Sequence, residues 1–458
     1  MAAAQAGVRE ATPSELRRAI IASAAGNATE WYDYGVYSYV VPIIATVIFN
    51  AKDPAVGLVA TYGALAASFL IRPLGGIVLG PLGDKLGRQR VLVLTILIMS
   101  LATFCLGLLP THAVIGVWSP VLLIAIRLVQ GFSTGGEYGG AATFMVEYSP
   151  DRNRGFWCSW LEFGTLGGFT VGAGIVTVFT LILPHAEMIS WGWRVPFLLA
   201  LPLGLVGLYL RLRLDEPPTF RELESKGQLA DASFPVGEAV RHAWKPILLC
   251  IGVVILLNVA DYTVLTYLPT YFSQVLGIGA TESLLIVLAT QIAMMCVISS
   301  MGALSDRIGR RAMLFIIAFG FIIFSIPAFL LIGHGGILGI IIGMIPVGLF
   351  MVMFLGTEPS TLPALFPGPY RYGGFAIAYN ISTSLFGGTA PLVETALIDK
   401  FHDNLIPAYY VIAAAIVTLV PIFLMRETAR RSIRGTEVPG SPEQDEQLAA
   451  DAAAAPGD

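Results

Sequence analysis

Long apolar segments, separated by short polar ones, recur along almost the whole chain. Each holds about 20 residues or more, which is the length at which a helix crosses a hydrocarbon core of roughly 30 Å. The predicted spans cover residues 19–48, 57–82, 91–109, 120–148, 156–183, 194–213, 246–275, 282–304, 312–333, 336–365, 373–398 and 407–425. The pattern therefore predicts an all-α membrane protein with twelve transmembrane helices.

The composition favours the same class. Of the 458 residues, 55% are hydrophobic and 13% are charged, whereas soluble domains carry about 25% charged residues. The first 18 residues lack the apolar core and the cleavage site of a signal peptide, so we expect the first span to remain in the protein. The four cysteines lie in or beside apolar spans without a C-x-x-C spacing, which favours buried thiols over a metal site or a disulfide.

Basic residues are distributed unevenly between the loops. They gather before span 1 and after every even-numbered span, whereas the other loops hold little beyond Lys52, Arg194 and Lys400. Because positive charge favours the cytoplasmic side, both termini and every even-numbered loop are predicted to face the cytoplasm. This alternation independently supports an even number of spans.

A short motif occurs twice, at equivalent places in the chain. Residues 80–90 read GPLGDKLGRQR and residues 302–311 read GALSDRIGRR, and both follow the second span of a six-span set. The repeat predicts two pseudo-symmetric six-helix halves, which place a substrate site at their interface near the bilayer midplane. The predicted parts are a cytoplasmic N-terminal segment (1–18), an N-terminal half (19–214), a cytoplasmic linker (215–245), a C-terminal half (246–426) and a disordered cytoplasmic tail (427–458).

The repeated motif predicts a conformational latch on the cytoplasmic side. Its first glycine permits close helix contact, its aspartate can accept hydrogen bonds from a facing helix N-terminus, and its basic residues can anchor to acidic groups. The alternative is a basic loop that only sets the membrane topology. The motif occurs at the equivalent place in both halves, which favours the latch. The predicted gate residues are Gly80, Asp84, Lys85, Gly87, Arg88, Glu147, Arg154, Gly302, Asp306, Arg307, Gly309 and Arg310.

These two loops resemble the signature loop of the major facilitator superfamily. The stretches GNATEWYDYGVY (26–37), FLIRPLGG (69–76), RLVQGFSTGGEYGG (127–140) and WGWRVPF (191–197) are similar to its metabolite:proton symporter branch. Within that branch, EYSPDRNRG (147–155) and NVADYTVLTYLPTYFS (258–273) resemble the proline/betaine (osmoprotectant) transporters most. The resemblance implies alternating access, a multi-pass protein of the bacterial inner (plasma) membrane, and energy from a proton gradient.

Two predicted spans carry polar stripes that must face protein or water. In span 1, Asn27, Glu30, Asp33, Tyr34 and Tyr37 share one helical face. In span 4 the stripe comprises Arg127, Gln130, Thr134, Glu137 and Tyr138, beside a ladder of small residues, Gly131, Gly135 and Gly139, that permits close helix packing.

The partner of Asp33 is open between two arginines. Counting about 1.5 Å per residue from the span ends puts Arg72 and Asp33 both near the middle and Arg127 closer to the outside, so depth favours Arg72. The resemblance favours Arg127, because sugar–proton symporters of the superfamily pair a span-1 aspartate with a span-4 arginine at that position.

Midplane acids outnumber the two intramembrane arginines, so at least one carboxylate lacks a permanent cation and is suited to carry a proton. The predicted proton-coupling residues are Asp33, Glu137, Arg127, Arg72 and Glu30. For each acid the alternative is a permanent buried ion pair, and for Glu30 a gate. Three other acids stay open between gate and coupling roles: Glu162, Glu358 and Glu394.

Aromatic residues crowd the same polar faces. They suit a quaternary or secondary ammonium through cation–π attraction, while packing is the alternative role for each. The predicted substrate-binding residues are Trp31, Tyr34, Tyr37, Tyr138, Asp261, Tyr262 and Tyr379.

The sequence thus predicts a proton-coupled symporter of a small zwitterion such as proline or glycine betaine. The alternative substrate is a mono- or dicarboxylate, such as 2-oxoglutarate, citrate or shikimate, and exchange in place of symport stays open. We expect no enzyme activity, metal or other cofactor, because no metal-ligand cluster, phosphate-binding glycine loop or Ser/His/Asp arrangement is present in the sequence. The expected partners are the substrate, protons and lipid, with no nucleic acid, and the protein is expected to be monomeric.

Overall fold

A computed structural model of the protein describes residues 13–86, 88–212 and 236–433, together with 438, 441–443 and 446. In the N-terminal half the helices are α1 (Pro13–Tyr39), α2 (Val41–Ile44), η1 (Ala45–Phe49), α3 (Pro54–Leu70), α4 (Arg72–Leu86), α5 (Arg88–Leu108), α6 (His112–Ile115), α7 (Trp118–Thr134), α8 (Glu137–Tyr148), η2 (Asp151–Asn153), α9 (Arg154–Ile182), α10 (His185–Glu187), η3 (Met188–Gly192), α11 (Arg194–Leu198) and α12 (Ala200–Leu212).

In the C-terminal half they are α14 (Val236–Asp261), η4 (Tyr262–Tyr267), α15 (Leu268–Thr270), η5 (Tyr271–Val275), α16 (Ala280–Ile308), α17 (Arg310–His334), α18 (Gly336–Thr361), η6 (Pro363–Leu365), η7 (Gly368–Tyr370), α19 (Arg371–Ser382), η8 (Thr383–Gly387), α20 (Ala390–Phe401) and α21 (Ile406–Leu424). Each predicted span corresponds to one of these helices or to a run of consecutive ones, so the twelve-helix prediction is confirmed.

Several spans are broken rather than straight. Among the described helices, eight are long and apolar enough to cross a membrane, and the pair Leu16–Tyr39 and Val41–Phe49, bent by 56°, makes a ninth. Of the remaining spans, the third contains a shorter apolar helix, Val93–Leu108, whereas the fourth and the eleventh are interrupted. The break between α7 and α8 lies at Gly135 and Gly136, and η8 separates α19 from α20.

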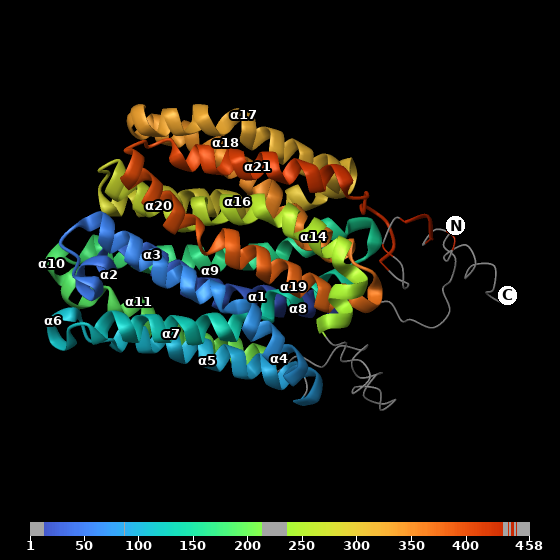
Figure 1. The fold of residues 1–458 in the computed structure, drawn as a ribbon, viewed down its shortest axis with the longest axis horizontal. Helices are drawn as coiled ribbons and strands as arrows, with labels where there is room; N and C mark the ends of the chain where they lie inside the picture. Colours follow the sequence, from blue (N-terminus) through green and yellow to red (C-terminus); the bar gives the residue numbers. More distant parts are fainter. Residues whose placement is uncertain are drawn as a thin grey trace.

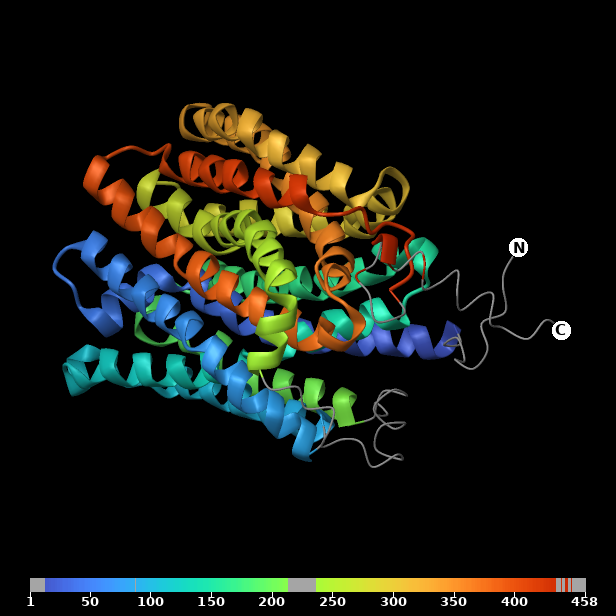
Figure 2. The same ribbon diagram turned by 45° about the vertical axis from the view of Figure 1, so that its right-hand side comes forward.

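The two halves lie side by side with their long helices roughly parallel. Figure 1 shows the blue-to-green helices on one side of the bundle and the yellow-to-red helices on the other, and the separation persists in the turned view of Figure 2. Across the interface, α9 packs against α16 and α18, α3 against α20, and α4 and α8 against α19. The repeated motif lies at the ends of α4 and α16, and we call this end of the bundle the signature-loop end.

The predicted glycine ladder of span 4 is confirmed as a surface of close backbone contact. A Cβ atom on Gly131 would collide with the backbone of Ser68, and one on Gly135 with the backbone of Arg72. Gly139 faces the other half, where such an atom would lie 2.9 Å from Cβ of Ala376. These glycines bring span 4 against span 2 and against α19.

Two predicted boundaries differ from the structure. Helix α14 begins at Val236, inside the predicted linker, because the seventh span extends beyond its apolar part through a kink at Ala243. The predicted disorder of the tail is wrong for 427–433, since Thr428 and Ile433 are buried and Glu427 is hydrogen-bonded. The other residues of the predicted segments 1–18, 215–245 and 427–458 lie largely outside the described residues.

Candidate functional site

The carboxylate of Asp33 lies on α1 between two residues of α7. Gln130 donates a hydrogen bond from Nε2 to Oδ2 of Asp33 at 2.8 Å and another to the hydroxyl of Thr103. Nη1 of Arg127 lies 3.9 Å from the same carboxylate oxygen. Of the two arginines, the structure therefore brings Arg127 to Asp33, although beyond hydrogen-bond distance.

Arg72 pairs with Glu30 instead. Nη2 of Arg72 donates to Oε1 of Glu30 at 3.0 Å, and both side chains are buried. The depth-based expectation that Arg72 pairs with Asp33 is wrong. Depth could not separate the two acids, because Glu30 and Asp33 lie about one turn apart on the same face of α1.

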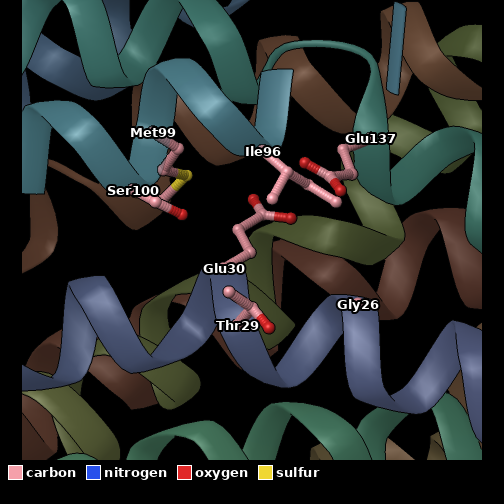
Figure 3. A pocket seen from close by; sticks show the side chains of 7 residues that line it. All are labelled: Gly26, Thr29, Glu30, Ile96, Met99, Ser100 and Glu137. Carbon is pink, nitrogen blue, oxygen red and sulfur yellow. The ribbon is translucent and has the colours of Figure 1, made fainter. Parts of the chain in front are cut away.

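Glu137 lies with Glu30 rather than with Asp33. The two carboxyl groups point into one small cavity between α1, α5 and α8, as Figure 3 shows. The cavity is lined by Gly26, Thr29, Glu30, Ile96, Met99, Ser100 and Glu137. Glu137 is the first residue of α8, where the positive end of the helix dipole favours a carboxylate.

Four aromatic rings meet at the interface of the halves, and we call them the aromatic cluster. Tyr34 and Phe69 lie 4.8 Å apart, Phe69 and Tyr262 5.2 Å, Trp31 and Tyr34 5.7 Å, and Trp31 and Tyr262 6.2 Å between ring centroids. The sequence predicted three of the four. It missed Phe69, because a phenylalanine in an apolar span carries no signal beyond packing.

Arg72 lies at the edge of the aromatic cluster. Its guanidinium carbon is 5.1 Å from the ring centroid of Phe69 and 5.8 Å from that of Tyr34. Nε and Nη1 of Arg72 have no hydrogen-bond partner, although the side chain is fully buried. A buried guanidinium with two unsatisfied donors is suited to receive a carboxylate.

Tyr37, predicted to bind substrate, lies outside the aromatic cluster. Its ring centroid is 3.5 Å from the guanidinium carbon of Arg127, and its hydroxyl donates to the carbonyl of Thr61 at 2.8 Å. The structure therefore makes Tyr37 a support for Arg127. Helical facing alone could not separate the two roles, because Tyr34 and Tyr37 lie one turn apart on the same face.

Tyr138 and Tyr379 form a second aromatic contact between the halves, stacked at 4.3 Å. The hydroxyl of Tyr138 lies 2.8 Å from Oε1 of Glu162 and 2.5 Å from Oε1 of Glu358. Asp261 is also buried, and its Oδ1 has no hydrogen-bond partner.

The second copy of the repeated motif caps a helix of the opposite half. Asp306 accepts hydrogen bonds from the backbone N–H groups of Gly155 at 2.8 Å and Phe156 at 3.0 Å, at the start of α9. Arg310 donates to the same carboxylate at 2.8 Å. The predicted contact between the motif aspartate and a facing helix N-terminus is thus present here, and it joins the two halves at the signature-loop end.

The rest of this copy is arranged around the cap. Gly302 lies directly against Gly155, and Gly309 adopts a left-handed conformation with φ of 99° that favours glycine. Arg310 also donates to the hydroxyl of Ser360, whereas Arg307 is exposed.

In the first copy of the motif, Gly87 lies outside the described residues, and so do the side chains of Asp84, Lys85 and Arg88 and the surroundings of Gly80. Their gate roles stay predictions.

Glu147 and Arg154, predicted to act in one gate network, have different partners. Glu147 pairs with Arg371 of α19 at 3.5 Å, whereas Arg154 pairs with Asp151 and donates to the carbonyl of Arg431 at 3.1 Å. The sequence analysis missed Arg371 as a gate residue. A basic residue that follows span 10 indicated only that this loop faces the cytoplasm. Both pairs lie at the signature-loop end.

The halves also touch at the opposite end of the bundle. Tyr62 donates to the hydroxyl of Thr270 at 2.8 Å, and Gln291 donates to the hydroxyl of Tyr39 at 2.6 Å. Contacts between the halves therefore exist on both sides of the aromatic cluster.

Comparison with known proteins agrees with this architecture. The sequence profile of the Major Facilitator Superfamily matches residues 24–391. The chain is 44% identical to the glycine betaine/proline/ectoine/pipecolic acid transporter OusA of Dickeya dadantii, over 92% of this chain and 85% of that protein. It is 44% identical to the proline/betaine transporter of Escherichia coli K12, with the same coverage. A putative proline/betaine transporter of Staphylococcus aureus is 40% identical, over 94% of this chain and 92% of its own length.

Solved structures show the same fold at low identity. The proton:xylose symporter XylE bound to 6-bromo-6-deoxy-D-glucose matches with a TM-score of 0.75 and 16% identity, over 92% of this chain and 98% of that one. A partially occluded, inward-open XylE from E. coli matches with a TM-score of 0.72 and 15% identity, over 91% and 99%. The chain belongs to the major facilitator superfamily and is a multi-pass transporter of the bacterial inner membrane, not an enzyme.

Proposed function

We propose that this protein takes up a small zwitterionic osmolyte, such as proline or glycine betaine, by proton-coupled symport and alternating access. The names of its relatives, at 40% to 44% identity, support the substrate class. The observation that carries the proposal is the buried guanidinium of Arg72, with two unsatisfied donors at the edge of the aromatic cluster.

The two ends of a zwitterion match the two parts of this site. The carboxylate is received by the unsatisfied Nη1 of Arg72, whose Nη2 stays on Glu30. The ammonium group lies against the rings of Trp31 and Tyr262, where cation–π attraction contributes very roughly 0.5–2 kcal/mol for each ring. Because the rings come from both halves, a bound substrate draws the halves together.

We assign proton coupling to Asp33. Its contact with Arg127 is long, so Gln130 is its hydrogen-bond partner and the arginine contributes through charge alone. Protonation removes that attraction and frees the two halves to move around the loaded site. When Asp33 releases the proton to the cytoplasm, its attraction to Arg127 is restored. Glu137, in the small cavity beside Glu30, is the second candidate for a proton carrier.

The orientation follows from the charges. The signature-loop end, with most basic residues, faces the cytoplasm by the positive-inside rule. One chain supplies every residue of this site, and the functional unit is therefore proposed to be the monomer.

Uptake into proteoliposomes tests the substrate and the coupling together. Labelled proline, glycine betaine and 2-oxoglutarate are offered under an imposed proton gradient, at two osmolalities. The proposal predicts that proline or betaine accumulates and that a protonophore abolishes the accumulation. Accumulation of 2-oxoglutarate alone would reject the zwitterion in favour of the carboxylate alternative.

A further inference from the structure

A pair of buried carboxyl groups joins the two halves away from Asp33. Glu162 comes from α9 of the N-terminal half and Glu358 from α18 of the C-terminal half, and both are at most 2% exposed. The hydroxyl of Tyr138 lies between them, at 2.8 Å from Glu162 and 2.5 Å from Glu358. The pair lies between the Asp306 cap and the aromatic cluster.

The two contacts need one more hydrogen than the tyrosine owns. A tyrosine hydroxyl has a single hydrogen and can donate it to only one carboxylate. The second contact then requires a carboxyl group that donates its own hydrogen to the tyrosine oxygen. At least one of Glu162 and Glu358 must therefore hold a proton while the halves are closed.

The surroundings offer no cation to replace that proton. In the part of the chain that the structure describes, neither glutamate forms an ion pair with an arginine or lysine. The titratable groups that face the pair are Tyr138, Tyr379, Asp261 and Cys250. Arg72 lies beyond Tyr379 and is paired with Glu30.

An independent observation points to the same place. Asp261, 5% exposed, faces the pair from α14, and its Oδ1 has no hydrogen-bond partner. Oε2 of Glu358 likewise has none. Two of the three acids in this buried place therefore have an unsatisfied oxygen. Such a group of acids is stable only when protons are bound, because unpaired buried charges repel and cannot be solvated.

We propose that Glu162 and Glu358 form a second proton-binding site, which assembles across the halves only when the signature-loop end is closed. The shared proton holds that end shut. Its loss leaves two carboxylates facing each other, and their repulsion parts α9 from α18 and opens the path from the aromatic cluster. The inference rests on the proposed function only for the direction of proton movement, whereas the site itself is independent of transport.

Infrared difference spectroscopy on the full chain in liposomes tests the proton directly, without substrate. The carbonyl band of protonated carboxyl groups is compared between the wild type and the double variant Glu162→Gln with Glu358→Gln. The expected result is the loss of one carboxyl equivalent, with no loss in Glu282→Gln, an exposed control. Loss of none, or of two independent equivalents, overturns the proposal.

Electron paramagnetic resonance tests the latch. Nitroxide labels at Asn153→Cys and Ile308→Cys, both exposed, report on the two halves at this end in a chain without its native cysteines. The labels should separate as pH rises in the wild type, at lower pH in Tyr138→Phe, and not at all in the double glutamine variant. If the distance between the labels in the wild type does not change with pH, the proposed latch is wrong. Neither the infrared nor the resonance measurement uses substrate uptake. Both therefore test the proton site even if the uptake experiment shows that the protein is not a symporter.

Discussion

The guanidinium of Arg127 stops 3.9 Å from the carboxylate of Asp33 and stacks at 3.5 Å on the ring of Tyr37. The arginine is thus held by the aromatic ring, and the carboxylate by the amide of Gln130. A pair built this way can lose its electrostatic attraction on protonation without dismantling either support, which is the property that a coupling site needs.

The first prediction concerns Asp33. Replacing Asp33 by Asn keeps a hydrogen-bond acceptor for Gln130 but removes the group that binds the proton. Uphill uptake in proteoliposomes should fall to background, whereas exchange of labelled for unlabelled substrate should persist. The matched control is Asp399→Asn, at an exposed carboxylate on α20. Uphill uptake that survives in Asp33→Asn clears this residue of the coupling role.

The second prediction concerns Arg72. Arg72→Lys keeps the charge near Glu30 but loses the planar fork that receives a carboxylate. A lost charge-assisted hydrogen bond costs about 1.5–3 kcal/mol, so KM for proline should rise roughly 10- to 150-fold. Arg194→Lys, outside the site, serves as the control. An unchanged KM in the Arg72 variant would place the substrate carboxylate elsewhere.

The third prediction separates cation–π attraction from packing. Trp31→Leu removes the aromatic face and should weaken glycine betaine binding by roughly 2- to 30-fold, because the contact contributes about 0.5–2 kcal/mol. Trp31→Phe should recover part of the loss. Trp191→Leu, at an exposed tryptophan, should change nothing. Equal KM values in Trp31→Leu and Trp31→Phe would show that ring electrostatics play no part.

The fourth prediction concerns the cap of α9. Asp306→Ala removes the acceptor of two backbone N–H groups and the partner of Arg310. Loss of a helix cap costs about 0.5–2 kcal/mol. The closed signature-loop end should therefore become roughly 2- to 30-fold less populated, measured by the distance between nitroxide labels at Asn153→Cys and Ile308→Cys. A distance distribution equal to that of the labelled parent with Asp306 intact would mean that the cap does not hold the end closed.

The architecture was predictable because membrane helices need long apolar runs and because the repeated motif marks two halves. The same argument predicted that a motif aspartate meets a facing helix, as Asp306 does. Composition could not reveal the breaks at Gly135 and at η8, since they depend on packing between spans.

The pairing of charges was beyond the sequence. Depth along the helices favoured Asp33 as the partner of Arg72, but the arginine pairs with Glu30, one turn earlier on the same face of α1. Glu162 and Glu358 are nearly 200 positions apart in the chain, and only the folded interface brings them to one tyrosine hydroxyl. Such long-range contacts leave no periodic signal in a single sequence.

The central claim is that movement of a zwitterion through this site is coupled to movement of a proton. The most direct test adds proline or glycine betaine outside proteoliposomes without an imposed gradient and follows the pH inside with a trapped dye. The account predicts that the substrate acidifies the lumen in the wild type and leaves it unchanged in Asp33→Asn. Accumulation of the zwitterion in the wild type with no change in internal pH would contradict it.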